Sequence, residues 1–333
     1  MNKAVSTWAV VLAGGEGTRL HSLTTAPSGI AVPKQFCSLQ GGPSLLQKAL
    51  QRALAIAPLH RICTVVAAQH RVWREAQLQY LPDDNVIEQP DNRGTAHGVL
   101  LPLLRILARD PDASIVLLPA DHYVRDEAVF AHALRQAAKR VAEHRDAVYL
   151  LGMEPDGPDT ELGYIVPADR NPYQPSRVVE FVEKPPLDLA RALLARGALW
   201  NAFIIASSAR ALLALYDRRF FSTIARMRHA VKHNSRSPLV AIATADLYRQ
   251  LPNIDFSRHV LEGQEARLQV LPVPQCGWTD LGTPQRVVRT LQHLSRSVST
   301  RSLISDAALG LDLSAQHWRL ECARNRVALD RAV

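Results

Sequence analysis

The stretch of this sequence whose chemistry can be named first is a glycine loop at residues 10–20, VVLAGGEGTRL. Backbone amides in a tight glycine turn can approach phosphate oxygens, and Arg19 and Lys34 add two cations close by. A dinucleotide-binding loop would need a third glycine and an acidic residue about 20 positions on, whereas this chain has Leu20 and then Lys34. A P-loop would need Gly-Lys followed by Ser or Thr, which is absent here. The loop predicts a polyanionic ligand, and a glycine turn that only closes a βα unit is the alternative.

Two carboxylates suggest what would accompany that ligand. Asp121 lies in LPADH and Asp280 lies in GWTDLG, and each taken singly is compatible with an ordinary turn residue. Together with a triphosphate loop, they are what Mg²⁺-assisted phosphoryl chemistry needs, because oxygen ligands and substrate phosphates share the ion. FVEKP and WNAF add the adjacent Glu183 and Lys184, and Asn201.

The elements that position these residues follow from hydrophobic periodicity. β-Branched runs predict strands that alternate with helical patterns in the first half of the chain. The predicted strands cover residues 7–13, 61–68, 114–120 and 146–152, and the predicted helices cover 44–57, 94–110 (disturbed at Pro102) and 129–144. This alternation predicts an α/β fold with a mostly parallel sheet and helices on both faces. Asp121 then follows a strand end, where open α/β sheets bind ligands.

The pattern changes after Gly152. Short extended pieces are expected at 163–167, 177–182 and 199–206, and helices at 209–232, 240–249 and 284–294. We expect one domain over residues 1–290, in which about 153–275 form an inserted lid on the same sheet, followed by a short tail over 291–333.

Composition excludes several classes of function. The chain has 333 residues, 47% of them hydrophobic, and a net charge of +8. The arginines are dispersed and aromatics make up only 6%, so neither a basic nucleic-acid stripe nor a base-stacking platform is expected. No apolar run is long enough for a bilayer and no cleavable signal pattern is present, which favours a cytoplasmic protein with no membrane partner. The four cysteines form no CxxC pair, so no zinc site is indicated.

Eight motifs, taken together, resemble the mannose-1-phosphate guanylyltransferases within the sugar-nucleotidyltransferase family. The likeness runs from about residue 7 to 290. The motifs are VVLAGGEGTRL (10–20), PKQF (33–36), RGTA (93–96), LLPADH (117–122), FVEKP (181–185), LWNAF (199–203), NIDFSRHVLE (253–262) and GWTDLGTP (277–284).

The resemblance implies a GT-A-like, Rossmann-like nucleotidyltransferase fold, with a mixed sheet and an inserted sugar-binding subdomain. It implies transfer of GMP from GTP to mannose 1-phosphate, which yields GDP-mannose and pyrophosphate. It further implies the cofactor Mg²⁺, and it leaves a homodimer open. No general base is needed, because the nucleophile is already a phosphate anion, and His97 and His122 are assigned structural roles.

Site residues are carried over from the family position by position. The nucleotide would lie on Leu12, Ala13, Gly14, Gly15, Gly17, Thr18, Gln89, Gly94 and Thr95. Arg19 and Lys34 would act on its phosphates, Lys184 on the sugar phosphate, and Asp121 and Asp280 on the metal. The sugar would contact Gly163, Glu183, Asn201 and Asp255.

The chain departs from the family pattern at three places. His21-Ser22 replace a hydrophobic residue and proline, Gln89 stands where Glu is common, and Gly94 and His97 replace Asn and Pro. Base and sugar therefore stay open, with heptose or glucose 1-phosphate as alternatives to mannose 1-phosphate. A non-catalytic sugar-nucleotide-binding regulator is a further alternative, against which the intact charged motif residues argue.

Overall fold

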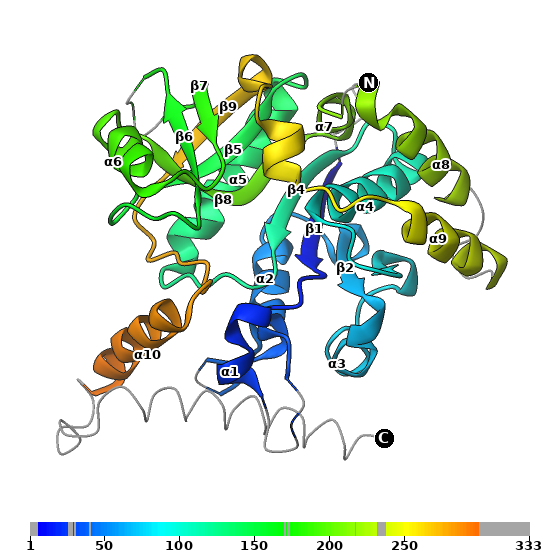
Figure 1. The fold of residues 1–333 in the computed structure, drawn as a ribbon, viewed down its shortest axis with the longest axis horizontal. Helices are drawn as coiled ribbons and strands as arrows, with labels where there is room; N and C mark the ends of the chain where they lie inside the picture. The colour runs from blue at the N-terminus through cyan, green and yellow to red at the C-terminus, as the bar shows by residue number, and fades with distance from the viewer. Residues whose placement is uncertain are drawn as a thin grey trace.

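The computed structural model describes residues 6–25, 29, 31–39, 41–169, 171, 174–216, 218–231 and 238–299. Its centre is a nine-stranded sheet with the order β3-β2-β1-β4-β8-β5-β9-β7-β6, in which β6 also pairs with β8. Figure 1 shows helices on both faces of this sheet. The strands are β1 (Thr7–Ala13), β2 (Ile62–Ala67), β3 (Val86–Gln89), β4 (Ser114–Pro119), β5 (Val148–Met153), β6 (Gly163–Pro167), β7 (Ser176–Val182), β8 (Leu199–Ser208) and β9 (Leu268–Val273).

The sheet is mixed, which confirms the α/β class. The parallel pairs β1–β2, β1–β4 and β2–β3 form the half built from the N-terminal part of the chain. β8 runs antiparallel between β4 and β5, while β9 is parallel to β5. Five of the nine described pairings are antiparallel, so the mostly parallel sheet expected from the sequence is found only in the half formed by β1 to β4, where strands and helices alternate.

Two hydrophobic layers cover the two faces. Alternate residues of β1 point to opposite sides, so Ala9 and Val11 join one cluster while Trp8 and Val10 join the other. The first layer includes α2, α5 and part of α10, and the second includes α4, α7, α8 and α9. The helices are α1 (His21–Thr24), α2 (Leu45–Leu54), α3 (Arg71–Gln77), α4 (Thr95–Arg109), α5 (Glu127–Glu143), α6 (Leu187–Ala195), α7 (Ala209–Ala214), α8 (Phe221–Val231), α9 (Pro238–Gln250) and α10 (Pro284–Ser299).

Two expectations about helices need revision. Pro102 lies inside α4, yet the helix runs unbroken from Thr95 to Arg109, with most of its residues buried in the second layer. The helical region expected over 209–232 consists of two separate helices, α7 and α8, with a short turn, Arg218–Phe220, before α8. The tail beyond residue 299 lies outside the described residues. None of the described helices combines the length and apolarity required to cross a bilayer.

Candidate functional site

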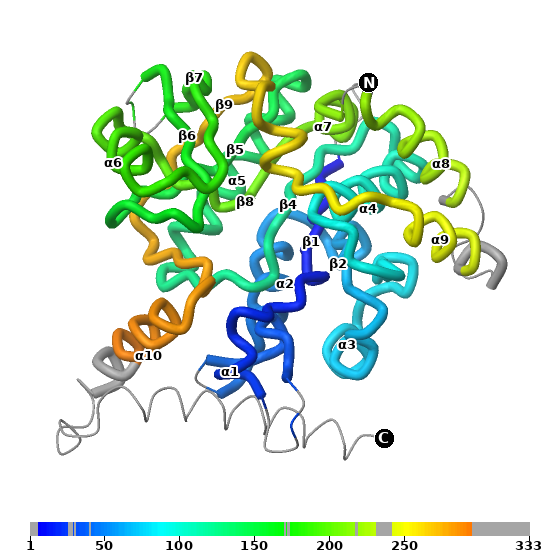
Figure 2. Tube along the Cα trace, viewed as in Figure 1, coloured from blue at the N-terminus to red at the C-terminus, as the bar shows by residue number. Residues whose placement is uncertain are grey.

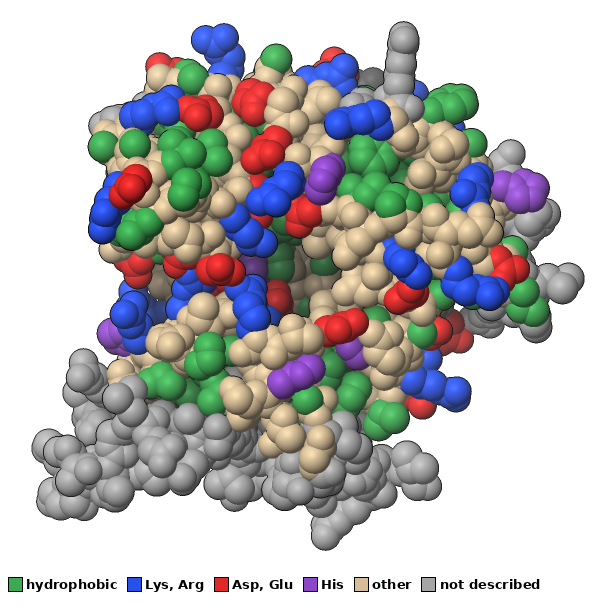
Figure 3. Space-filling view, viewed as in Figure 1, with side chains coloured by type: hydrophobic (Ala, Val, Ile, Leu, Met, Phe, Trp, Pro, Cys, Tyr) green, Lys and Arg blue, Asp and Glu red, His purple; other side chains and the backbone are tan. Residues whose placement is uncertain are grey.

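The predicted glycine loop follows the end of β1, and Asp121 follows the end of β4. The molecule also has one hollowed face (Figure 3). Figure 3 shows this hollow between the part that carries α6 and β6 and the part that carries α1 and α2. Acidic and basic side chains surround it in that view. Carboxyl ends of parallel strands are the usual ligand-binding edge of an α/β sheet.

The glycine loop follows β1, and the side chain of Gln35 binds its backbone from the core side. Gly17 has a φ of 66°, a left-handed conformation that glycine adopts at little cost. The Nε2 amide of the buried Gln35 donates to the carbonyl oxygens of Ala13 at 2.9 Å and Gly15 at 2.8 Å. Since two carbonyls are engaged from the core side, the outer side of the loop stays available to a ligand. Gln35 lies within the PKQF motif, but its residue type alone gives no sign of this supporting role.

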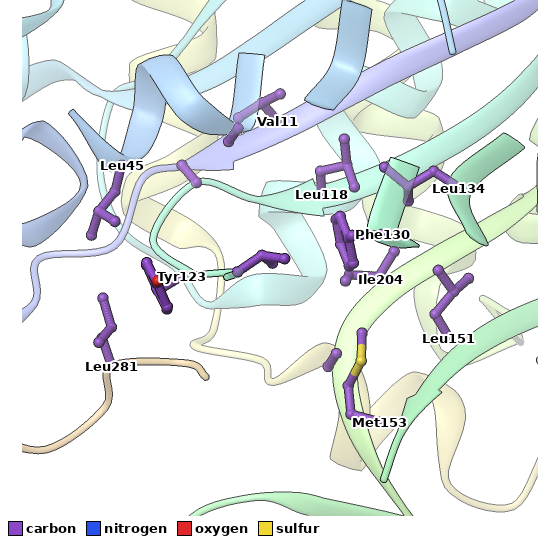
Figure 4. Packing of buried hydrophobic residues seen from close by; sticks show 14 of the residues in the cluster. Val11, Leu45, Leu118, Tyr123, Phe130, Leu134, Leu151, Met153, Ile204 and Leu281 are labelled. Atoms are coloured by element: carbon purple, nitrogen blue, oxygen red, sulfur yellow. The ribbon is translucent and has the colours of Figure 1, made fainter. Parts of the chain in front are cut away.

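The two predicted metal carboxylates come from loops that are paired with each other. The Tyr123 and Thr279 backbones exchange two hydrogen bonds of 2.9 Å, which join the loop after β4 to the loop before α10. Figure 4 shows the side chains of Tyr123 and Leu281 near each other in the core beside Leu45. These contacts bring the backbones that carry Asp121 and Asp280 together, although the residues are far apart in the sequence.

Lys34 joins the two carboxylate loops. Its Nζ lies 2.9 Å from Oδ2 of Asp121 and donates to the carbonyl oxygen of Asp280 at 2.9 Å. The lysine side chain is only 10% exposed, so these contacts are poorly screened by water. Lys34 therefore follows the glycine loop, where the sequence predicts a phosphate-binding cation, but in this structure its ammonium group binds Asp121 and the Asp280 backbone.

The carboxyl groups of this pair differ in pKa. Burial is the largest single effect on Asp121 and raises its pKa, but the charge of Lys34, the electrostatic effect of His122 and the hydrogen bonds to the carboxylate together outweigh burial, so the pKa lies below its ordinary value. For Asp280, burial dominates and the pKa is raised, with Lys34 opposing and Asp121 contributing further to the rise. The effect of Asp121 on Asp280 means that the two carboxylates lie within electrostatic range of each other.

His122 and Trp278 lie directly behind Asp121. Trp278 Nε1 donates to His122 Nδ1 at 3.2 Å, and His122 Nε2 is 3.8 Å from Asp121 Oδ1. Burial lowers the pKa of His122 to about 4, with Lys34 adding to the decrease and Asp121 opposing it. An imidazole that accepts at Nδ1 carries its proton on Nε2, so the neutral ring directs its N–H toward the carboxylate.

Two carboxylates of the loop between β5 and β6, Asp159 and Glu161, form ion pairs with Arg286 and Arg19. Arg19, expected on the phosphates, has its side chain 55% exposed and pairs with Glu161 at 2.6 Å. Arg286, near the start of α10, pairs with both Asp280 and Asp159. Arg286 and the two β5–β6 loop carboxylates were not identified from the sequence, because no local motif marks them.

Four of the residues predicted to bind the sugar and its phosphate form a compact group at the start of β6 (Gly163), directly after β7 (Glu183 and Lys184) and within β8 (Asn201). Gly163 lies directly opposite Asn201 in the sheet. A Cβ at Gly163 would lie 2.5 Å from Oε2 of Glu183, so only glycine leaves room for this carboxyl group. Lys184 Nζ is 3.7 Å from Glu183 Oε1, and Lys184 itself adopts a φ of 51°, which is uncommon outside glycine.

Glu183 has a strongly raised carboxyl pKa. Burial is the largest cause that raises its pKa to about 7. The negative charges of Asp255 and Glu262 raise it further, while Lys184 lowers it. Glu183 therefore changes charge close to neutral pH.

The RGTA and NIDF motifs form one unit at the N-terminus of α4. Ala96 N–H donates to Ile254 O at 3.0 Å, and Phe256 N–H donates to Thr95 Oγ1 at 2.7 Å. Figure 2 shows the segment after α9 crossing over α4 on its way to β9. A Cβ at Gly94 would lie 2.2 Å from Ile254 O, so this crossing requires glycine. Asp255 is thereby brought from a distant part of the chain to the side of Thr95.

Gln89 lies between two glycines at the end of β3. Its Oε1 would be 3.0 Å from a Cβ at Gly14 and 3.5 Å from a Cβ at Gly98. Because both residues are glycines, the Gln89 side chain has room between them. Its Nε2 donates to the buried hydroxyl of Tyr248 at 3.2 Å. This places the Gln89 amide beside Gly14 of the glycine loop.

A separate groove lies at the opposite end of α4. It has a volume of 570 Å³ and a mainly apolar lining. Because α4 begins at Thr95 beside the glycine loop, its C-terminal half lies away from the polar residues described above. The groove is lined by Leu104, Leu107, Ala108, Pro111, Arg210, Leu213, Ala214 and Arg228.

Comparison with known proteins agrees with this geometry. A model of the family described as Nucleotidyl transferase matches residues 8–297. The alginate biosynthesis protein AlgA of Pseudomonas aeruginosa is 30% identical over 282 residues, which cover 82% of this chain and 56% of that protein. A mannose-1-phosphate guanylyltransferase of Klebsiella pneumoniae is 32% identical over 253 residues, 74% of this chain and 50% of that protein. The chain thus spans about half the length of these curated relatives.

A solved structure from Thermus thermophilus, described as a mannose-1-phosphate geranyltransferase, superposes with a TM-score of 0.68. It is 27% identical, and the match covers 86% of this chain and 79% of that chain. The sequence and structure matches confirm the resemblance found in the motifs.

Proposed function

Because the chain belongs to the nucleotidyl transferase family, we propose that it transfers GMP from GTP to mannose 1-phosphate, releasing pyrophosphate. The observation that carries this proposal is the position of Lys34, which joins Asp121 to the Asp280 backbone beside the glycine loop. On β6 to β8, Glu183 and Asn201 form a hydroxyl-binding group. Phosphate-binding and sugar-binding chemistry thus meet at one end of the sheet.

We propose a division of labour for the nucleotide side. Residues 12–18 supply backbone amides to the triphosphate, and Gln35 keeps that backbone in place. Arg19 and Lys34 neutralise charge that grows on the departing pyrophosphate, which is the main catalytic demand when the nucleophile is already an anion. Gln89, Gly94 and Thr95 line the base.

Asp121 and Asp280 would hold Mg²⁺, although no group of three or more His, Cys, Asp or Glu among the described residues is placed to hold a metal ion by itself. Two carboxylates are enough for this ion, because it keeps waters and takes its remaining ligands from substrate phosphates. When bound, the metal would screen the phosphate charges. Asp121 fits this role because its lowered pKa keeps it ionised.

On the sugar side, Lys184 would bind the phosphate of the incoming sugar. Glu183, Asn201 and Asp255, with the backbone of Gly163, would bind its hydroxyls. Since the two phosphates enter from opposite sides, the protein can align the attacking oxygen with the α-phosphorus, which accelerates the reaction through orientation.

The neutral amide of Gln89 supports a second candidate, a sugar-1-phosphate nucleotidyltransferase with another base or sugar. A carboxylate would accept from both guanine N–H groups, whereas an amide offers one acceptor and discriminates less. We still propose GTP over ATP, in line with the names of the relatives. A cytoplasmic location and a homodimer remain predictions from the sequence.

Pyrophosphate release tests the proposal. The full chain would be incubated with each of the four NTPs, Mg²⁺, and mannose, glucose or heptose 1-phosphate. We expect the fastest release with GTP and mannose 1-phosphate and none in EDTA. Faster turnover with another pair would keep the reaction class and replace the substrates, while no release with any pair would favour a non-catalytic binder.

A further inference from the structure

The arginine near the start of α10, Arg286, links two carboxylates across the site. One of its terminal nitrogens, Nη1, donates to Asp280 Oδ1, and the other, Nη2, pairs with Asp159 Oδ2. Its side chain is 16% exposed, and those of the two aspartates are similarly covered. A planar guanidinium that binds two carboxylates at once is restricted in its side-chain conformation. This fork therefore fixes Asp280 against the loop between β5 and β6.

The other oxygen of Asp280 is also engaged. It lies against Gly282, where a Cβ would approach Oδ2 to 2.3 Å, so only glycine permits this carboxylate position. Oδ1 of Asp280 thus accepts from Arg286, while Oδ2 lies against Gly282. A divalent cation at this carboxylate would meet a guanidinium that already occupies Oδ1.

We propose that Arg286 is a positioning residue that competes with the divalent cation for Asp280 and releases the carboxylate when substrate phosphates take the guanidinium. The inference rests on the proposed metal role of Asp280. A guanidinium and a divalent ion repel each other and cannot both use Oδ1. The metal alone must therefore break the Arg286 contact to bind, whereas metal and nucleotide together provide a new partner for each displaced group.

Arg286 lies near the predicted phosphate ligand Arg19, because its partner Asp159 and the partner of Arg19, Glu161, are two residues apart in the loop between β5 and β6. Its pKa is lowered mainly by burial, with Asp156 opposing and the positive charges of Arg19 and Arg289 adding to the decrease. Arg19 is the predicted phosphate ligand of the glycine loop, so two arginines approach one another there. Phosphate oxygens accept from guanidinium groups as strongly as carboxylates do, and one polyphosphate can satisfy both arginines.

Direct binding measurements on the full chain test the competition. Mn²⁺ binding without nucleotide would be followed by electron paramagnetic resonance, and GTP binding in EDTA by calorimetry, for wild type and Arg286→Gln. We expect Arg286→Gln to bind Mn²⁺ about tenfold more tightly and metal-free GTP about tenfold more weakly, since one charged contact is released in the first case and lost in the second. A residue with only a structural role would weaken both.

Arg289→Gln is the matched control, because it removes the same charge from the same helix and Arg289 is not a hydrogen-bond partner of Asp280 in the described structure. Its effect on Mn²⁺ binding should stay within about twofold, as expected for a screened charge that does not contact the carboxylate. Arg286→Lys, which keeps the charge but not the fork, should shift both affinities in the same directions by less, and it serves as the test if Arg286→Gln does not fold.

Asp280→Asn separates the two levels of the argument. If Asp280→Asn loses Mn²⁺ binding but Arg286→Gln gains none, the competition is refuted and the metal assignment stands. If Asp280→Asn binds Mn²⁺ as wild type does, the metal assignment fails and the competition fails with it. Equal gains in Arg286→Gln and Arg289→Gln would reduce the effect to general electrostatics and also overturn the inference.

Discussion

The raised pKa of Glu183 would make the proposed sugar pocket sensitive to pH, and Glu183→Gln tests this through protein stability. Its side chain is 10% exposed and its folded-state pKa is raised from 4.5 to about 7, mainly by burial. Below pH 4.5, the carboxyl group is protonated in both the folded and unfolded chain. Between pH 4.5 and 7, the unfolded chain ionises first, so the free energy of unfolding falls as pH rises. A shift of this size corresponds to ~3 kcal/mol, at about 1.4 kcal/mol per pKa unit.

Glutamine has nearly the same shape and does not titrate. We therefore expect the stability of Glu183→Gln relative to wild type to rise by ~3 kcal/mol between about pH 4.5 and 7 and to stay level above about pH 8. Urea unfolding across this pH range, followed by far-ultraviolet circular dichroism, measures this difference, because other titrating groups act equally in both proteins. Glu154→Gln controls for replacing an exposed carboxylate with an amide. A difference that does not change with pH would refute the assignment of a raised pKa to Glu183.

Three further outcomes follow from the geometry of the site. Asp121→Asn should lower turnover at least about 100-fold in a pyrophosphate-release assay, because an amide cannot neutralise a divalent ion; near-wild-type turnover would remove Asp121 from the metal site. Lys184→Ala should chiefly raise KM for the sugar 1-phosphate and Lys34→Ala should chiefly lower kcat, each by about 10- to 1000-fold, and unchanged kinetics in Lys184→Ala would contradict its role. Gly94→Ala should cost roughly 2–5 kcal/mol in urea unfolding, because its Cβ would meet a carbonyl at a φ of 85°. Gly15→Ala, which meets nothing within 4 Å, should cost less than about 0.5 kcal/mol, and equal losses would refute the packing argument.

Strands with a local signature could be predicted from the sequence, whereas their long-range order could not. The runs TWAVVLA and SIVLLP are apolar and β-branched, and they form β1 and β4 as expected. β9, LQVLPV, was missed, since a proline inside a short run usually argues against a strand. The insertion of β8 between β4 and β5 depends on partners about 50 to 90 residues away, which a periodicity within one segment cannot reveal.

The candidate site shows the same division. Gly163, Glu183 and Asn201 were assigned to one pocket through the resemblance, and the structure brings them together. The partners of the cations were not foreseen, because an ion pair such as that of Arg286 with Asp159 joins loops whose proximity only the fold decides. Motifs thus identify residues by type and order, but charge compensation depends on tertiary packing.

The ion pairs of the cations in the candidate site affect which anions can bind there. Lys34, Lys184, Arg19 and Arg286 each pair with a carboxylate in the described structure, so an incoming phosphate must exchange with one of them. Exposed pairs contribute little, so the Arg19 contact is exchanged at small cost. The pair of Lys34 with Asp121 is largely buried, and breaking it leaves an uncompensated charge unless a second cation arrives. A divalent ion carried by a polyphosphate supplies that charge, whereas a simple monoanion does not. We therefore expect the paired cations to favour a metal-bound triphosphate over other anions, even though the whole chain is basic.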